Sequence, residues 1–318
     1  MRFEDCPTAP SSIIASMSIV VVGSIGIDFV AVASRLPKVG ETVLATRPLH
    51  IGPGGKGFNQ AVGAARLGAD VRFATKTGHG DLGRQARSFL EGEGLLTDLA
   101  RESDADNQVA LIFVDDSGRN MISVTPGASA DVLPADVAEL GLTSADILLA
   151  QLEIPVATVA AAAAHAKEAG ATVVLNPAPA TPLPSGLLEL IDIATPNETE
   201  LSLLTGLSTA TTSEVVAAAE RLIEMGVGEV VATVGAKGAI HVDHAGSTNY
   251  PSLLVDAVDT TGAGDAFNAG LVVGLSRGLG LADAIQLGAR SGAYCVTQLG
   301  VLDGLATMDQ LAEFVARN

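Results

Sequence analysis

Residues 259–270 read DTTGAGDAFNAG, a stretch that predicts a glycine loop leading into a helix. Gly262 and Gly264 free the backbone, and we expect the helix to begin near Ala263. A helix N-terminus presents unpaired N–H groups and a positive dipole end, so it favours a phosphoryl group. Asp265 would repel a phosphate, but its carboxylate suits the role of a base that takes a proton from an attacking hydroxyl. An acidic residue that only stabilises the helix dipole explains this fragment equally well.

Upstream of this loop, short β-branched runs alternate with Ala-rich segments of helical period. The predicted strands are 18–23, 69–75, 145–150, 171–176, 191–196 and 229–235. The predicted helices are 57–67, 81–93, 155–169, 197–205 and 212–225, and residues 263–315 read as mostly helix. This alternation predicts an α/β fold with a mostly parallel sheet and crossover helices on both faces.

Two segments, 28–51 and 107–125, break the alternation because each reads as a pair of amphipathic strands without a crossover helix. They predict a small separate β-sheet, which would act as a lid if it lay over a binding crevice. The predicted domain plan is a disordered tail of residues 1–16, a core of residues 17–27, 52–106 and 126–318, and the lid inserted in that core.

Composition limits the partners and the compartment. The 318 residues carry a net charge of −18, which disfavours nucleic acid and anionic membrane surfaces as partners. Two cysteines cannot form a disulfide framework, and the chain start lacks the features of a signal peptide. No apolar run approaches the roughly 20 residues that span a bilayer. A cytoplasmic protein is therefore predicted.

The stretch GPGGKGFNQA, residues 52–61, contains a second glycine cluster. It formally satisfies the dinucleotide fingerprint G-x-G-x-x-G, but it does not directly follow the first strand as that motif requires. Glycines beside Lys56 and Asn59 instead suit close backbone approach to a polyhydroxylated ligand. A tight turn with a solvated lysine is the structural alternative.

The stretch TPNETE, residues 195–200, admits two interpretations. Asn197 and Glu200 have the spacing of a capping box, which needs no ligand. The same two side chains suit a phosphate and a hydrated Mg²⁺. Farther on, His241 and His244 form HVDH beside an expected hairpin, and we interpret this stretch as a solvated turn rather than a metal site.

These fragments resemble the ribokinase-like (PfkB) carbohydrate kinases, and most closely the ribokinase branch of that family. The resemblance runs from about residue 18 to the C-terminus and rests on GSIGID (23–28), GGKGFNQA (54–61), QLE (151–153), NPAPA (176–180), TPNETE and VDTTGAGDAFNAG (258–270). It implies a Rossmann-like three-layer core with a small β lid, and a homodimer formed through that lid.

The resemblance also implies roles for individual residues. Asp265 would be the base that deprotonates the 5-hydroxyl of the sugar, with Gly262, Ala263 and Gly264 as the anion hole. The implied sugar ligands are Asp28, Gly54, Gly55, Lys56, Asn59 and Glu153. The implied contacts to ATP and Mg²⁺ are Asn197, Glu200, Thr233, Gly235 and Gly238. An activating K⁺ is implied at Asp259, Thr261, Cys295, Gln298 and Gly300.

Three positions depart from the family pattern. Gly26 stands where these kinases usually carry a sugar-binding Asn, and losing one such hydrogen bond costs about 1 kcal/mol. Phe58 replaces a usual Ala, and it either adds bulk near the pocket or packs into the core. Asp303–Gly304 replaces a usual Pro–Ser pair at the end of the implied K⁺ loop. These departures leave the chemistry intact and put the identity of the sugar in doubt.

The resemblance therefore implies a kinase that transfers the γ-phosphoryl group of Mg-ATP to the 5-hydroxyl of a pentose, D-ribose first. The alternative with the same chemistry is a kinase for 2-deoxyribose, another furanose or ketose, or a nucleoside. From other classes, GPGGKG suggests a nucleotide-linked dehydrogenase, and loss of catalysis would leave a sugar-binding regulator. The chain order opposes the dehydrogenase, and the intact GAGD at 262–265 opposes the regulator.

Overall fold

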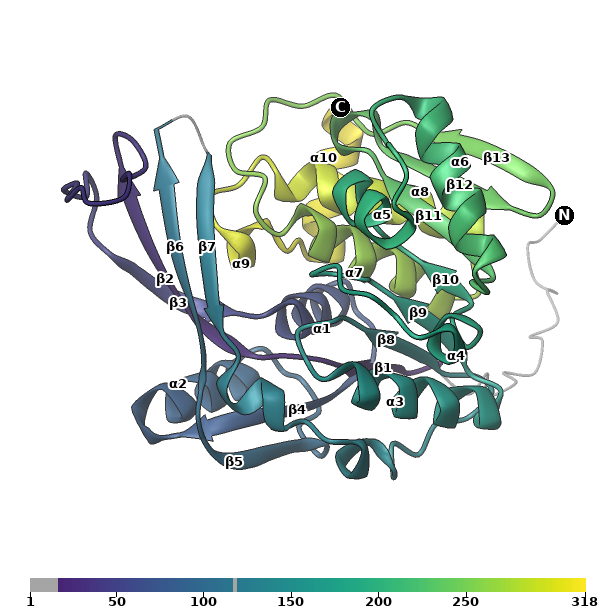
Figure 1. The fold of residues 1–318 in the computed structure, drawn as a ribbon, viewed down its shortest axis with the longest axis horizontal. Coiled ribbons are helices and arrows are strands. Elements are labelled where there is room, and N and C mark those ends of the chain that lie inside the picture. The colour runs from purple at the N-terminus through teal and green to yellow at the C-terminus, as the bar shows by residue number, and fades with distance from the viewer. Residues whose placement is uncertain (1–16, 117–118) are drawn as a thin grey trace, which may run out of the picture.

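The computed structural model describes residues 17–116 and 119–318, and its centre is a nine-stranded sheet (Figure 1). The predicted tail, residues 1–16, lies outside the described residues. The strands of this sheet are β1 (Ile19–Val22), β4 (Val71–His79), β5 (Ala100–Asp106), β8 (Ile147–Ala150), β9 (Thr172–Leu175), β10 (Ile193–Ala194), β11 (Glu229–Thr233), β12 (Ala239–Asp243) and β13 (Gly246–Tyr250). Their order is β13-β12-β11-β10-β9-β8-β1-β4-β5.

The sheet is parallel from β5 to β11, and β12 and β13 add an antiparallel edge. Strand β1 shows why its sequence is apolar throughout. Ile19 and Val21 pack into the core on one face, and Val20 and Val22 pack into the core on the other. A strand covered on both faces has no exposed positions for polar residues.

Helices cover both faces of the large sheet and complete three layers. One face carries α1 (Lys56–Arg66), α2 (Gly80–Gly92), α7 (Ala263–Ser276), α8 (Leu281–Cys295) and α10 (Met308–Arg317). The other face carries α3 (Val156–Ala169), α4 (Ser185–Leu188), α5 (Glu198–Thr205) and α6 (Thr212–Glu224). A short helix, α9 (Val301–Gly304), lies near the N-terminal end of α7. The predicted α/β fold with helices on both faces is confirmed.

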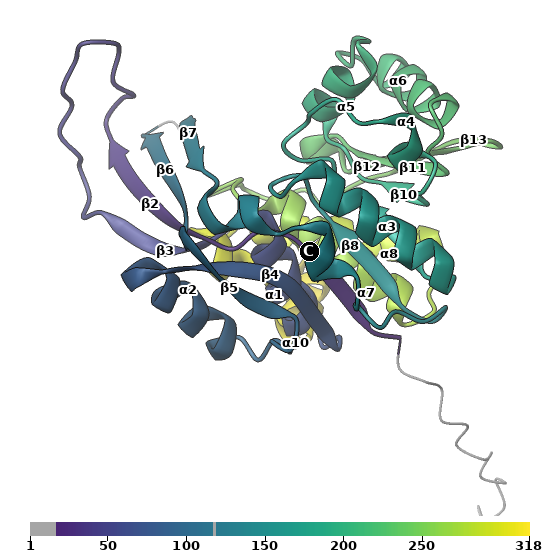
Figure 2. The ribbon, with the colours of Figure 1, turned by 60° about the horizontal axis from the view of Figure 1, so that its bottom comes forward.

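A separate four-stranded sheet stands beside the core (Figure 2). Its strands are β2 (Gly26–Ala33), β3 (His50–Gly54), β6 (Gln108–Asp115) and β7 (Asn120–Thr125), in the order β3-β2-β6-β7. Strands β2 and β3 are antiparallel, as are β6 and β7, whereas β2 and β6 run parallel. We call these four strands the lid sheet. It includes residues on both sides of the predicted segment 28–51.

One predicted strand is longer than the strand in the structure, and one strand, β5, was missed. Residues 191–196 contribute only Ile193 and Ala194 to the sheet, and Pro196, which has no N–H to donate, follows shortly after. Strand β5 was not predicted, because its sequence ARESDAD is mostly polar and carries no apolar alternation. It lies at the edge of the sheet, where such residues remain in solvent. No helix in the described part of the chain is long and apolar enough to cross a membrane.

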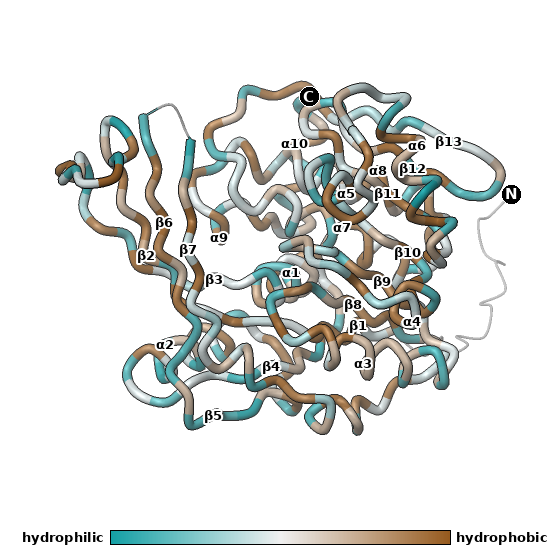
Figure 3. Tube along the Cα trace, viewed as in Figure 1, coloured by the Kyte–Doolittle hydropathy of each residue, from teal (hydrophilic) through white to brown (hydrophobic). Residues whose placement is uncertain are grey.

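Hydrophobic residues concentrate along the central strands and the helix faces that cover them, and they also run along β6 and β7 (Figure 3). In the lid sheet several of these side chains are exposed, from 42% at Phe113 to 52% at Met121. The lid sheet therefore presents apolar side chains that its own strands do not cover.

Candidate active site

Polar side chains gather where neighbouring parallel strands of the core end. Ser24 and Gln151 follow β1 and β8, and Asn176 and Thr195 follow β9 and β10. Carboxyl ends of parallel strands meet at one edge of a sheet, and ligands bind there in open α/β folds. All four side chains are buried, so this edge holds a polar cluster inside the protein.

The glycine loop before α7 delivers the helix N-terminus to this edge. The helix begins at Ala263, as the sequence predicted, and Gly262 caps it with a φ of 80°. A Cβ at Gly262 would lie 2.6 Å from a methyl carbon of Val301, so only glycine fits there. At Gly264 a Cβ would meet nothing within 4 Å. The helix N-terminus therefore faces open space, as an anion site requires.

Asp265 lies in the first turn of α7 and is only 6% exposed. Its carboxylate accepts hydrogen bonds from the amide groups of Asn59 and Gln60, both at 2.9 Å. Burial raises the pKa of this carboxyl, and the Lys56 ammonium and the two amides oppose that rise. A buried carboxylate with a raised pKa, held in one position, suits a proton acceptor.

Lys56 begins α1 and sits among three carboxylates. Its backbone N–H donates to Glu153 at 2.8 Å, and the hydroxyl of Ser24 donates to the same carboxylate oxygen. Burial alone would lower the pKa of the Lys56 ammonium, but the charges of Asp265, Glu153 and Glu200 outweigh it and raise the pKa. The side chain therefore stays a cation, which can offset phosphate charge.

Asp28 reaches this cluster from the lid sheet. A Cβ at Gly54 would lie 2.0 Å from an oxygen of the Asp28 carboxylate, so the glycine leaves the space that this carboxylate occupies. Burial raises the pKa of Asp28 to about 7, and the charges of Glu153 and Asp265 add to that rise. Hydrogen-bond donors from a bound ligand would favour its ionised form. Sugar hydroxyls are donors of this kind.

A cavity of about 200 Å³ joins the predicted catalytic and nucleotide positions. Its lining includes Lys56, Asn197, Glu200, Thr233, Gly264 and Asp265. These residues come from α1, α5, β11 and α7, which lie far apart along the chain. The fold thus brings Asn197, Glu200 and Thr233 to the N-terminus of α7, whereas Gly235 and Gly238 do not line this cavity.

Asn197 and Glu200 form the capping box that their spacing predicted. The side chain of Asn197 accepts from the N–H of Glu200, and the Glu200 carboxylate accepts from the N–H of Asn197, both at 2.8 Å. Burial raises the pKa of Glu200, and Lys56 partly offsets that rise. Because Glu200 also lines the cavity, the cap and a metal-binding role are compatible.

Gly235 and Gly238 lie in the turn that follows β11. A Cβ at Gly238 would lie 2.1 Å from the carbonyl oxygen of Tyr250, so the backbone alone requires this glycine. At Gly235 the space is open.

The residues implied to hold K⁺ lie beside the glycine loop. The Asp259 carboxylate accepts from the N–H groups of Thr261 and Gly300, at 2.9 and 3.0 Å. Burial raises the pKa of the Cys295 thiol to about 12. This thiol donates to the carbonyl of Thr261 at 3.6 Å. The Gln298 side chain instead donates to Thr297. Asp259 thus ties the two loops together.

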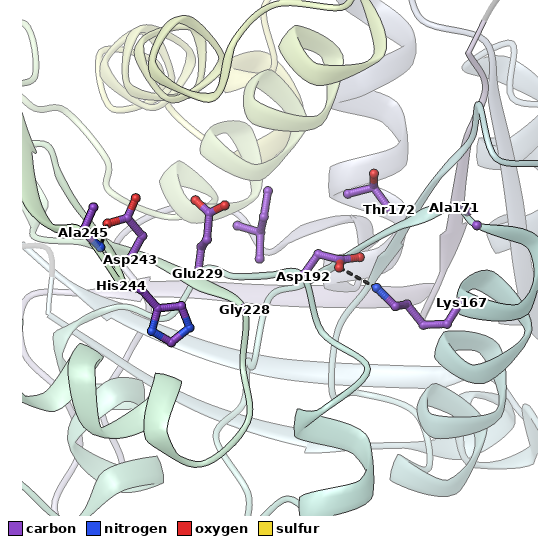
Figure 4. A pocket seen from close by; sticks show the side chains of 11 residues that line it. Lys167, Ala171, Thr172, Asp192, Gly228, Glu229, Asp243, His244 and Ala245 are labelled. Carbon is purple, nitrogen blue, oxygen red and sulfur yellow. Dashed lines mark hydrogen bonds and ion pairs between the residues drawn. The ribbon is translucent and has the colours of Figure 1, made fainter.

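A second cavity, of about 660 Å³, opens at the opposite edge of the sheet, where strands begin (Figure 4). Its lining includes the Lys167–Asp192 ion pair and His244, and it contains none of the predicted site residues. The hairpin expected near HVDH is formed by β12 and β13, and His244 is exposed in the turn between them. His241 lies outside that turn, contrary to the prediction. It lies on β12, and its Nε2 is 2.6 Å from the Glu229 carboxylate.

The structure shows where Phe58, one of the three departures from the family pattern, packs, and it adds site residues that the sequence analysis missed. Phe58 is fully buried in the core, so it packs away from the site. Gln60 contacts Asp265 and Asn176, and Gln151 donates to Gln60 at 2.6 Å. Gln60, Gln151 and Asn176 lie inside motifs already quoted, yet no role was assigned to them. Their burial was the missing signal.

Comparisons with known proteins show the family of this chain. The model of the pfkB family of carbohydrate kinases matches residues 16–308. A ribokinase of Haemophilus influenzae is 38% identical over 301 residues, which cover 94% of this chain and 98% of that protein. A deoxyribokinase of Salmonella typhimurium is 34% identical, covering 95% and 100%. The structure of Arabidopsis thaliana ribokinase complexed with ribose and ATP superposes with a TM-score of 0.84 at 30% identity, covering 94% and 99%. The chain belongs to the pfkB family of carbohydrate kinases.

Proposed function

We propose that this chain transfers the γ-phosphoryl group of Mg-ATP to the 5-hydroxyl of a pentose, with D-ribose as the preferred substrate. The observation that carries the proposal is the position of Asp265. Its carboxylate is buried at the N-terminus of α7, in one cavity with Lys56 and Glu200. A proton acceptor, an anion site and a cation thus lie together, as transfer of a phosphoryl group to a hydroxyl requires.

In the proposed reaction Asp265 accepts the proton of the sugar hydroxyl. The hydroxyl oxygen forms the new bond to the γ-phosphorus, and the bond from that phosphorus to the bridging oxygen of ADP breaks. The amides of Asn59 and Gln60 hold the carboxylate in place during this transfer. The pKa of Asp265, raised by burial, makes it a stronger base than an exposed aspartate.

Negative charge spreads over the transferring group in the transition state. In the proposal, the N–H groups of Gly262, Ala263 and Gly264 and the ammonium of Lys56 stabilise this charge. Gly262, Gly264 and Lys56 line the cavity, and the N–H of Ala263 donates to the carbonyl of Thr260 at 3.3 Å until the phosphoryl group binds. Mg²⁺ bound with ATP would neutralise further phosphate charge, and Glu200 is the carboxylate in the cavity that fits it. We assign Asn197, Thr233, Gly235 and Gly238 to the nucleotide.

On the sugar side we assign Asp28, Gly54, Gly55, Lys56, Asn59 and Glu153. The amide oxygen of Asn59 is buried without a hydrogen-bond partner in the described structure, and a sugar hydroxyl would satisfy it. Asp28 offers its carboxylate oxygens to the sugar from the lid sheet. Closure of the lid sheet over the bound sugar would also exclude water from the reaction.

Three further assignments belong to the same proposal. K⁺ would bind at the loops that Asp259 joins, where it would hold the glycine loop before α7 in place.

A homodimer would cover the exposed apolar residues Leu111, Phe113 and Met121 of the lid sheet, and light scattering measures its mass. The proposed location is the cytoplasm.

The ribokinases among the relatives favour ribose over other sugars, and the solved complex with ribose and ATP favours both substrates. The deoxyribokinase is the specific reason to keep 2-deoxyribose as the second candidate. Gly26, which supplies no side-chain hydrogen bond, is compatible with either sugar.

The test is a coupled assay of ADP release with Mg-ATP over ribose, deoxyribose, hexoses and nucleosides, with and without K⁺. We expect ribose to give a kcat/KM at least about tenfold above any other sugar, a difference of about 1.4 kcal/mol. We also expect K⁺ to raise kcat. A higher kcat/KM on deoxyribose or a nucleoside would make that compound the proposed substrate. The absence of any sugar-dependent ADP release would reject the proposed kinase function.

A further inference from the structure

Three positions form a row across the lid sheet beside the proposed sugar site. Gly26 of β2 pairs with Gly54 of β3 on one side and with Gln108 of β6 on the other. Residues paired across neighbouring strands project to the same face of a sheet, and so do residues two apart in one strand. Gln108 therefore projects to the face that carries Asp28.

The two glycines in this row leave space that two other side chains fill. The Asp28 carboxylate occupies the space at Gly54. The Gln108 side chain occupies the space at Gly26, where a Cβ would lie 3.0 Å from its Cγ and 3.1 Å from its Nε2. The amide of Gln108 thus stands where a side chain at position 26 would stand.

Gln108 is 2% exposed, and its amide oxygen has no hydrogen-bond partner among residues 17–116 and 119–318. Leaving such a group unpaired costs about 1–3 kcal/mol. The neighbouring Asn107 contrasts with it, because its amide accepts from the N–H of Gly78 and donates to the carbonyl of Gln108. The backbone at Gln108 is therefore held, while its buried side chain retains an unused acceptor.

We propose that Gln108 is a sugar-binding residue that determines specificity. Its amide bonds a hydroxyl of the sugar next to Asp28, and it supplies from β6 the amide that Gly26 in β2 does not supply. Gly26 and Gln108 then form a matched pair, because the glycine makes the space that the glutamine uses. This inference rests on the proposed sugar-kinase function.

The first experiment compares Gln108→Ala with the wild type. We expect KM for the sugar to rise about five- to twentyfold, as for the loss of one or two hydrogen bonds. We expect kcat and KM for ATP to stay within about twofold, because the lost contact forms in the ground state and the transition state alike. Gln286→Ala, an exposed glutamine on α8, is the matched control and should change nothing.

The second experiment separates sugar binding from a packing role. In wild-type protein Gly26→Asn should weaken sugar binding, because its side chain would contact Gln108. Combining Gly26→Asn with Gln108→Gly should restore the sugar KM to within about threefold of wild type, since the amide is then supplied from β2. A double variant no better than the single variants would overturn the matched pair.

The third experiment uses monodeoxy sugars. Gln108→Ala should cost nothing for the one deoxy sugar that lacks the contacted hydroxyl, and it should keep its full cost for the others. Equal losses for every sugar together with a lower Tm and a higher KM for ATP would show a structural role and overturn the proposal.

Calorimetry of sugar binding without ATP distinguishes failure of the Gln108 inference from failure of the proposed kinase function. If the wild type binds sugar and Gln108→Ala binds it at least about fivefold more weakly, the inference stands whatever the turnover. If the two bind equally, the inference fails while the kinase function stands. If the wild type neither binds nor phosphorylates any sugar, both fail.

Discussion

Replacing Asp265 by asparagine is expected to lower kcat by about 10³-fold or more, while KM for the sugar stays within about threefold of wild type. General-base catalysis typically contributes about 10²–10⁴-fold. Asparagine keeps the shape of the side chain beside Asn59 and Gln60 but cannot accept the proton. A steady-state assay with saturating Mg-ATP measures both constants.

The matched control is Asp283→Asn. Asp283 also lies in the first turn of a helix, α8, but it is exposed. The Asp283→Asn variant should keep kcat within twofold of wild type, because the loss of a favourable charge near the helix dipole changes stability and not the reaction. An Asp265→Asn variant that retained a tenth or more of the wild-type kcat would remove Asp265 from the role of base.

Replacing Asp28 by asparagine is expected to lower kcat/KM for the sugar by about 10²-fold, mainly through KM. Hydrogen bonds to a charged acceptor contribute about 1.5–3 kcal/mol, and the amide that replaces the carboxylate offers one acceptor in place of two. KM for ATP should hardly change, because Asp28 comes from the lid sheet and does not line the cavity with Asn197 and Glu200.

The same variant should stabilise the free protein, increasingly so at higher pH. The pKa of Asp28 is raised from 3.8 to about 7 in the folded state. The folded state therefore holds this proton more tightly than the unfolded state does, and that stabilisation is full below about pH 4 and is lost as pH rises through 7. Asparagine never ionises, so the variant escapes this loss.

Thermal unfolding without ligands at pH 5 and pH 8 tests the linkage. The Tm of Asp28→Asn minus that of wild type should be larger at pH 8 than at pH 5. An equal difference at the two values would mean that Asp28 titrates in the folded protein as it does in the unfolded chain. With saturating sugar at pH 8, the wild type should have a higher Tm than Asp28→Asn, because the Asp28 carboxylate binds the sugar well and the asparagine amide does not.

The order of elements was predictable from the sequence because each buried strand of the core carries its own signal. Strand β1 is apolar at every position, and the glycine loop marks the start of α7 at Ala263. Strand β5 was not predictable in this way, since an edge strand needs no apolar pattern. Its place follows only from the neighbouring β4.

The candidate site was predictable as a set of motifs, and its connections were not. Asp265 and Lys56 stood out by type and spacing, whereas Gln60 and Gln151 gained a role only when the fold buried them against Asp265 and one another. Gln108 is the clearest case. Its importance depends on facing Gly26 across two paired strands, and no local pattern in the sequence encodes that pairing.

Identification of the reaction product tests the central claim most directly. Wild-type protein is incubated with ribose and Mg-ATP, and the product is examined by mass spectrometry and phosphorus NMR. Our account predicts one ADP per sugar phosphorylated and a single phosphate ester at the 5-hydroxyl. A phosphate on another hydroxyl would contradict the assigned geometry, and ADP formed without any sugar phosphate would contradict the kinase reaction itself.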